Sequence, residues 1–210
     1  MSLHADALAS LEAWAAPDDA QEAARARYAA HLRDHPDGLD RACRPDHLTA
    51  STLVLDHDRT HVLLTLHAKA RRWFQLGGHC EPGDQTLAGA ALREAAEESG
   101  LADLDLDPVP LALDEHEVPF CGPAPGVEPD GLLVHHLDVR YVAVAPAGAT
   151  HALSEESLDL RWWPVDGLPP GAEELAPVVR RAVARAVARD QSTWSGGGGS
   201  TRAAADQPSR

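Results

Sequence analysis

The sequence predicts a mixed α/β domain preceded by a helical segment, in a chain of 210 residues. Short β-rich runs and helical patterns follow one another along the chain, which is typical of a sheet packed against helices. The length suits one ordinary domain with an appendage rather than two full-sized domains. We therefore divide the chain into a helical segment over residues 1–45, a main domain over residues 46–190 and a flexible tail of linker composition over residues 191–210.

Two helices are expected in the first segment. Apolar residues recur near helical spacing from Leu3 to about Leu32, and Pro17 followed by two aspartates marks a break and a new helix start. A His-Pro-Asp-Gly turn over residues 35–38 ends the second helix. We expect this segment either to cover the sheet or to form a homodimer contact.

The main domain begins with β-rich runs. Residues 52–55 and 61–66 flank a short polar turn and predict a hairpin. A third short strand over residues 73–76 runs into Gly77-Gly78, and a loop then continues to Asp84. Further strands are expected over residues 109–118, 134–144 and 160–163, and a last helix over residues 173–190.

The helix predicted over residues 86–99 carries three clustered carboxylates. At about 100° per residue, Glu94, Glu97 and Glu98 share one face, and small apolar residues cover the opposite face. Like charges at this spacing are unfavourable by a few tenths of a kcal/mol per pair, so the cluster favours a cation. Oxygen ligands favour Mg²⁺ or Mn²⁺, and the glycine pair before the helix lets the backbone approach closely and can offer a carbonyl as another oxygen ligand. A solvated acidic face is the alternative for such a run, but the strand, the glycine pair and the acidic loop before the helix point to a site.

The segment from Gly78 to Leu101 resembles the signature of the Nudix hydrolase family. The matching residues are Gly78, Arg93, Glu94, Ala95, Glu97, Glu98, Gly100 and Leu101. Asp84 stands where the family has glutamate, and eight residues rather than seven separate it from Arg93. The resemblance implies an α/β/α sandwich with a mixed sheet, and it implies that Arg93 and Asp84 support and orient the carboxylates.

The resemblance also implies hydrolysis of a nucleoside diphosphate linked to another moiety, by attack of water on phosphorus with Mg²⁺ or Mn²⁺. Glu94, Glu97, Glu98 and the Gly78 carbonyl are the implied metal ligands, with Glu94 and Glu98 counted as catalytic. The general base in similar enzymes is a glutamate of the helix or one on a loop before a late strand. Glu156 is our candidate on that loop, and Glu155 is the second choice. The equal alternative is that both glutamates are surface acids or helix-cap residues without a catalytic role.

Two other functions stay open. The domain can bind a nucleotide-like ligand without turning it over, although the retained glutamates favour an enzyme. Isomerase chemistry on an isoprenoid diphosphate also occurs in the superfamily and needs a catalytic cysteine with an acid across the substrate; neither Cys80 nor Cys121 has a partner visible in the sequence.

Substrate contacts are expected from basic residues and histidines near the site. Lys69, Arg71 and Arg72 precede the strand that leads into Gly78 and can meet phosphates, unless they are simply solvated. His116 and His135 flank a proline-rich loop, and strand alternation sends His135 and His136 to opposite faces. His79 and Cys80 suggest zinc, but we do not expect a zinc site because no Cys-x-x-Cys and no spaced histidine pair accompanies them.

Composition restricts the partners. Lys and Arg number 18 against 33 Asp and Glu, so the net charge is −15 and argues against binding nucleic acid or anionic membranes. Three widely spaced cysteines fit a reducing compartment rather than a disulfide framework. The sequence shows neither a signal-peptide pattern nor a long apolar run, so we expect a cytoplasmic protein that acts on a small nucleoside diphosphate or polyphosphate.

Overall fold

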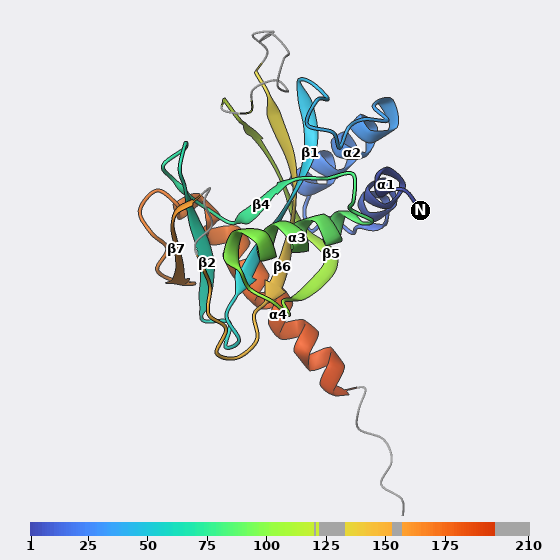
Figure 1. Cartoon of the computed structure of the whole chain (residues 1–210). Helices are drawn as coiled ribbons and strands as arrows, with labels where there is room; N and C mark the ends of the chain where they lie inside the picture. The colour runs from blue at the N-terminus through green and yellow to red at the C-terminus, as the bar shows by residue number, and fades with distance from the viewer. Residues whose placement is uncertain (120, 122–132, 153–156, 196–210) are drawn as a thin grey trace, which may run out of the picture.

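The helices and strands follow the order expected from the sequence. The computed structural model describes residues 1–119, 121, 133–152 and 157–195 (Figure 1). Its elements are α1 (Leu3–Ala13), α2 (Asp19–Asp34), β1 (Asp46–Leu55), β2 (His61–His67), β3 (Trp73–Phe74), β4 (Leu76–His79), α3 (Leu87–Ser99), β5 (Asp105–Glu117), β6 (His135–Val144), β7 (Ser157–Pro164), the 3₁₀ helix η1 (Glu173–Leu175) and α4 (Ala176–Ser195).

The sheet is mixed and has β1 at its centre. Its strand order is β3-β2-β1-β6-β5, with β4 paired to β1 and β7 paired to β2. β1 runs parallel to β6 over its whole length and antiparallel to both β2 and β4. One edge of β1 is divided between these two partners, because Thr49 to Thr52 pair with β4, whereas Val54 and Leu55 pair with β2.

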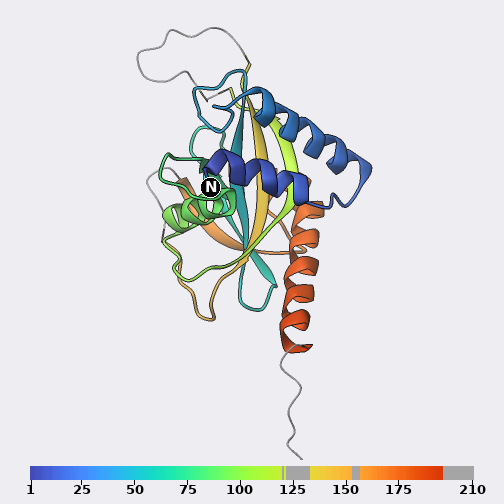
Figure 2. The same ribbon diagram turned by 90° about the vertical axis from the view of Figure 1, so that its right-hand side faces the viewer.

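Helices cover both faces of the sheet, so the α/β/α sandwich with N-terminal helices is confirmed. Alternation along β1 sends Leu48 and Ala50 to a core shared with α1, α2 and α3, and sends Leu53 and Leu55 to a core shared with α4. Figure 2 shows α1 and α2 in front of the sheet, with α4 at its side and extending past it. The described helices include none that is long and apolar enough to cross a membrane.

The two N-terminal helices begin where the sequence places them. Ser2 caps α1 and Asp18 caps α2, each through a side-chain oxygen that accepts a backbone N–H. The Asp6 carboxylate accepts a hydrogen bond of 2.8 Å from the first amide of α3 at Leu87. The N-terminal segment therefore covers the sheet, which was one of the two expectations for it. Through Asp6 it also supports the start of the acidic helix α3.

The predicted strand over residues 73–76 is divided in two. β3 pairs with β2 and β4 pairs with β1, so the chain changes partner at Gln75. The Gln75 side chain is buried there and donates to Ser51 at 3.3 Å and to Asp138 at 3.2 Å. Gly77 and Gly78 were expected to open a loop and instead lie within β4, because pairing with β1 compensates for their weak strand preference.

Candidate active site

Two glycines allow β4 to lie against both β1 and α3. A Cβ on Gly77, whose φ is +155°, would lie 2.5 Å from Ser51 Cα and 2.7 Å from the Ala50 carbonyl oxygen. A Cβ on Gly78 would lie 2.8 Å from the Glu94 carboxyl carbon. Because glycine has no side chain, the backbone of β1 can pack against Gly77 and the Glu94 carboxylate can pack against Gly78.

Glu94 and Glu98 extend from α3 toward β4, and Glu97 lies farther out on the same helix. α3 begins at the Thr86 cap and ends at Gly100, which has the left-handed conformation that the sequence predicted. Glu98 Oε2 accepts a hydrogen bond of 3.0 Å from the Gly77 amide. The Glu94 side chain is 17% exposed, whereas that of Glu97 is 59% exposed, so the carboxylates extend from the strand toward solvent.

Arg93 lies between the acidic helix and the loop. Its Nη1 donates to Glu94 at 3.1 Å and to Glu97 at 3.0 Å. Its Nε and Nη2 both donate to Asp84 at 3.0 Å, and Nη2 also donates to the His79 carbonyl at 3.0 Å. Asp84 is thus the bidentate partner of Arg93, and the shorter side chain with one extra intervening residue still reaches the guanidinium.

Burial raises the pKa of Glu94 above its usual value, while Arg93 acts in the opposite direction and the neighbouring Glu97 adds to the rise. A cation in contact with the carboxylate would reverse this rise by favouring the ionised form. The possible metal ligands of α3 at this position are carboxylate oxygens, which suit Mg²⁺ or Mn²⁺. The space that a side chain would fill at Gly78 adjoins the same carboxylate, so these residues fit a hard divalent ion.

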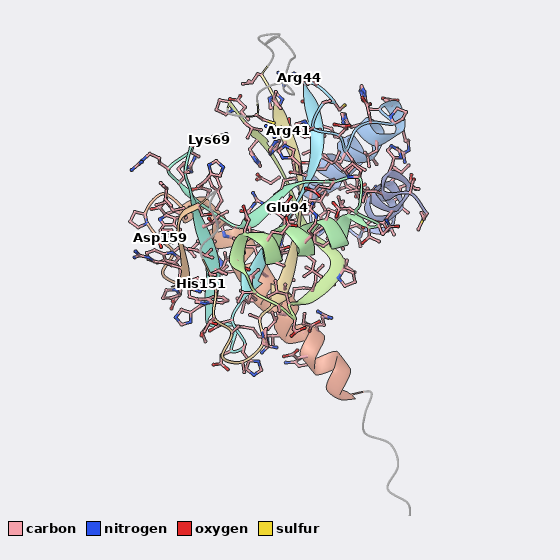
Figure 3. All side chains as sticks on the ribbon, viewed as in Figure 1. Arg41, Arg44, Lys69, Glu94, His151 and Asp159 are labelled. Carbon is pink, nitrogen blue, oxygen red and sulfur yellow. The ribbon has the colours of Figure 1, made fainter. Side chains whose placement is uncertain are left out.

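The three basic residues predicted to meet phosphates differ in their surroundings. Figure 3 shows Glu94 beneath β4, with Lys69 on the β2 side and Arg41 and Arg44 on the β1 side. Lys69 and Arg71 are exposed in the turn between β2 and β3. Arg72 instead forms an ion pair with Glu174 of η1 and lies over the Phe74 ring.

The two adjacent histidines of β6 face opposite sides of the sheet, as the alternation predicts. His135 Nδ1 lies 2.9 Å from Asp46 Oδ1, beside the N-terminal helices. His136 lies on the other face, where its ring centroid is 5.6 Å from that of His116. His116 Nδ1 is also 2.9 Å from Asp114 Oδ2.

Sequence reasoning missed a group of histidines and a cysteine on this second face. His47, His79, His136 and Cys121 bring their possible ligand atoms within 4.8 Å of one another. Burial lowers the pKa of His47, of His79 to about 4 and of His136 to about 2, so the three imidazoles are neutral at pH 7. Nothing in the sequence indicated that these side chains gather around His79, because they come from segments far apart in the chain and leave no local spacing pattern.

A buried acid was missed as well. Asp138 on β6 is 2% exposed and accepts from Thr49 at 3.1 Å, Ser51 at 2.6 Å and Arg140 at 3.3 Å. Gln75 also donates to it, so the network fixes the chain just before β4 against β1 and β6. Glu155 and Glu156, the candidates for the general base, lie outside the described residues.

Comparison with known proteins identifies the family. The NUDIX domain model matches residues 45–184, two thirds of the chain. Similar crystal structures include a NUDIX-family hydrolase from Clostridium perfringens, at 23% identity and a TM-score of 0.48, covering 67% of this chain and 97% of that one.

Two further similar structures have named activities. An Ap4A hydrolase binary complex from C. elegans is 18% identical with a TM-score of 0.49, covering 67% of this chain and 98% of that one. The dihydroneopterin triphosphate pyrophosphohydrolase of E. coli is 21% identical with a TM-score of 0.47, covering 70% and 97%. The comparison with curated proteins gives no match. On the strength of the domain match, which contains the whole signature from Gly78 to Leu101, the chain belongs to the Nudix hydrolase family.

Proposed function

We propose that this protein is a Mg²⁺- or Mn²⁺-dependent pyrophosphohydrolase that cleaves a nucleoside diphosphate linked to another moiety. The observation that carries the proposal is the position of Glu94 and Glu98 of α3 against the side-chain-free backbone of Gly78 and Gly77, with Glu97 joined to Glu94 through Arg93. Family membership supports a hydrolase, and the chemistry of the donor oxygens supports the metal.

Glu94, Glu97, Glu98 and the Gly78 carbonyl are the proposed ligands. A bound divalent ion would neutralise the pyrophosphate charge and lower the pKa of a bound water. Arg93 holds two of the glutamates in place through hydrogen bonds and is itself held by Asp84, so it acts as a positioning residue. The Gly77 amide restrains Glu98 in the same way.

Residues outside α3 are proposed to transfer the proton and to contact the substrate. Glu156 is the proposed general base, with Glu155 as the second choice, and it would accept a proton from the attacking water. Lys69 and Arg71 are exposed and can reach a phosphate chain, while Arg72 would first have to leave Glu174. His116 and His135 are the other proposed contacts, but His116 lies beside His136 and His135 lies beside Asp46 on the opposite face of the sheet, so at most one of the two contacts a given substrate.

A metal-dependent hydrolysis screen tests the proposal. Purified full-length protein is incubated with nucleoside triphosphates, dinucleoside polyphosphates, sugar nucleotides and dinucleotide cofactors, each with Mg²⁺ or Mn²⁺. We expect at least one substrate to yield two phosphorylated products, and Glu98→Gln to lower kcat/KM by about 100-fold or more, because even residues that only support metal ligands cost about 10- to 100-fold. Glu22→Gln, on the exposed face of α2, is the matched control and should keep full activity.

The same screen separates the other functions. A ligand that raises the melting temperature without forming product would support a binding module, and an isoprenoid diphosphate rearranged with its diphosphate intact would support an isomerase. Burial raises the pKa of the Cys80 thiol to about 12, which disfavours a reactive thiolate there. Equal inactivity of the wild type and Glu98→Gln on the whole panel would remove the support for a hydrolase.

A further inference from the structure

Four side chains from separate segments converge on the face of the sheet opposite α3. His47 belongs to β1, His79 to β4 and His136 to β6, and Cys121 lies beyond the end of β5. The ring centroid of His47 lies 5.2 Å from that of His79 and 4.9 Å from that of His136, and the His79 and His136 centroids are also 4.9 Å apart. The three rings therefore surround one point, at which the thiol also arrives.

The spacing of the ligand atoms matches a tetrahedral metal centre. Cys121 Sγ lies 3.9 Å from His47 Nε2 and 3.6 Å from His79 Nε2. Zn–S bonds of about 2.3 Å and Zn–N bonds of about 2.0 Å at tetrahedral angles separate sulfur from nitrogen by about 3.5 Å. Shifts of a few tenths of an ångström would bring these atoms onto a single zinc ion.

The orientation of the imidazoles also suits a metal. His47 Nδ1 lies 3.1 Å from the Cys43 carbonyl, which fixes the ring and leaves its Nε2 directed at Cys121. His136 Nε2 is buried and has no hydrogen-bond partner within the described ranges 1–119, 121, 133–152 and 157–195. A buried imidazole nitrogen without a partner is costly, and a metal bond would satisfy it.

We propose that His47, His79, His136 and Cys121 bind one Zn²⁺ ion at a site separate from the carboxylates of α3. Along β4, the missing side chain of Gly78 faces Glu94, so alternation directs His79 to the opposite side of the sheet. Three imidazoles and a thiolate prefer zinc to Mg²⁺, whereas the α3 oxygens have the reverse preference. Binding converts the Cys121 thiol to a thiolate and releases one proton to solvent, so the centre carries a net charge of about +1.

The proposed zinc site includes one strand of the signature, β4, together with its neighbours in the sheet. Zinc would tie β1, β4, β6 and the segment after β5 together at one end of the sheet. His79 takes part in both regions, because its ring lies in the cluster while its carbonyl accepts a hydrogen bond of 3.0 Å from Arg93. The proposed ion therefore stabilises the strand from which Gly78 faces the α3 carboxylates.

Cobalt spectroscopy of the full-length protein tests the proposal. Metal-free protein is titrated with Co²⁺, and we expect one equivalent to give the d–d bands of tetrahedral cobalt together with a near-ultraviolet thiolate-to-cobalt band, all removed by one equivalent of Zn²⁺. Cys121→Ser should abolish the thiolate band, and His136→Ala should weaken binding by about tenfold or more. Circular dichroism shows whether each variant is folded.

The other two cysteines are matched controls. Cys43 lies in a second group with His35 and Asp37, and Cys80 packs against the α1–α3 core, so Cys43→Ser and Cys80→Ser should keep the band. A band that survives in Cys121→Ser, or that is lost in Cys43→Ser, would place the metal elsewhere. Absence of the band in the wild type, or unchanged affinity in a folded His136→Ala variant, would also overturn the proposal.

Discussion

Arg93 connects the acidic helix, the preceding loop and the end of β4. It forms hydrogen bonds with two glutamates of α3, with both oxygens of Asp84 and with the His79 carbonyl. Hydrogen bonds between charged groups contribute about 1.5–3 kcal/mol each when they are shielded from water. The arginine of the signature thus has a structural task that can be separated experimentally from the task of the glutamates.

Asp84→Asn tests this task through the pH dependence of stability. Burial alone would raise the pKa of Asp84, but hydrogen bonds from Arg93 and from the Glu81 amide hold it below its usual value. A lowered folded-state pKa gives stability that is present above the unfolded value near 3.9 and is lost as pH falls through the folded value. We expect Asp84→Asn to lower the free energy of unfolding in urea by about 1–3 kcal/mol at pH 7, and by less at pH 3.

Asp58→Asn is the control, because Asp58 is an exposed acid in the turn between β1 and β2. It should leave the free energy of unfolding nearly unchanged at both pH values. A difference between wild type and Asp84→Asn that stays constant from pH 7 to pH 3 would contradict the proposed charge pairing.

The sequence predicts the carboxylates of α3 well, because a helix places residues three and four apart on one face. It predicts neither the hydrogen-bond network of Asp138 nor the cluster of His47, His79, His136 and Cys121, called the His47 cluster below. The members of both groups are far apart in the chain. Such groups depend on strand register: His79 pairs with Thr49 across β4 and β1, and His47 pairs with His136 across β1 and β6. Register is set by tertiary pairing and cannot be read from local spacing.

At the level of elements, β4 is the strand on which the site depends. It consists of four residues, pairs with β1 along one edge, and approaches α3 closely at Gly78. The sequence predicted a strand only as far as Leu76, followed by a glycine turn and a loop, because glycine is weak in strands and local propensity cannot show pairing with β1. The boundaries of α1, α2 and α3 were easier to predict, since caps and breaks such as Asp18, Thr86 and Gly100 are local signals.

Replacing the two glycines of β4 one at a time by alanine should give a stability defect at Gly77 and an activity defect at Gly78. In Gly77→Ala, the new Cβ would meet backbone atoms of Ser51 and Ala50, which cannot move without separating the strands. We expect a loss of about 2–4 kcal/mol in the free energy of unfolding. In Gly78→Ala, the three atoms nearest to the new Cβ all belong to the carboxylate at the end of the Glu94 side chain, which can move, so stability should change by less than about 1 kcal/mol while kcat falls.

Urea unfolding and steady-state kinetics on the same preparations make the comparison. Equal destabilisation by the two substitutions would show that β4 does not approach β1 and α3 as described. Full activity of a folded Gly78→Ala variant would show that the Glu94 carboxylate is not needed in its observed position.

At the scale of the whole molecule, the net charge of −15 opposes the binding of anions. Bound cations would remove this opposition, because a hard divalent ion at the α3 carboxylates and zinc at the His47 cluster would each add positive charge near Gly78 and His79. A small polyphosphate needs only such a local change of sign, whereas a nucleic acid or a membrane surface needs many positive contacts spread over the protein.

Manganese binding measured by electron paramagnetic resonance tests the central claim, that the α3 carboxylates hold the divalent ion. Protein is first loaded with Zn²⁺ so that the His47 cluster is filled, and the signal of free Mn²⁺ is followed during titration. We predict that the wild type and Glu22→Gln remove the free signal equally, and that Glu94→Gln and Glu98→Gln bind about tenfold more weakly or worse. Equal depletion of the signal by the wild type and by both of these variants would contradict the account.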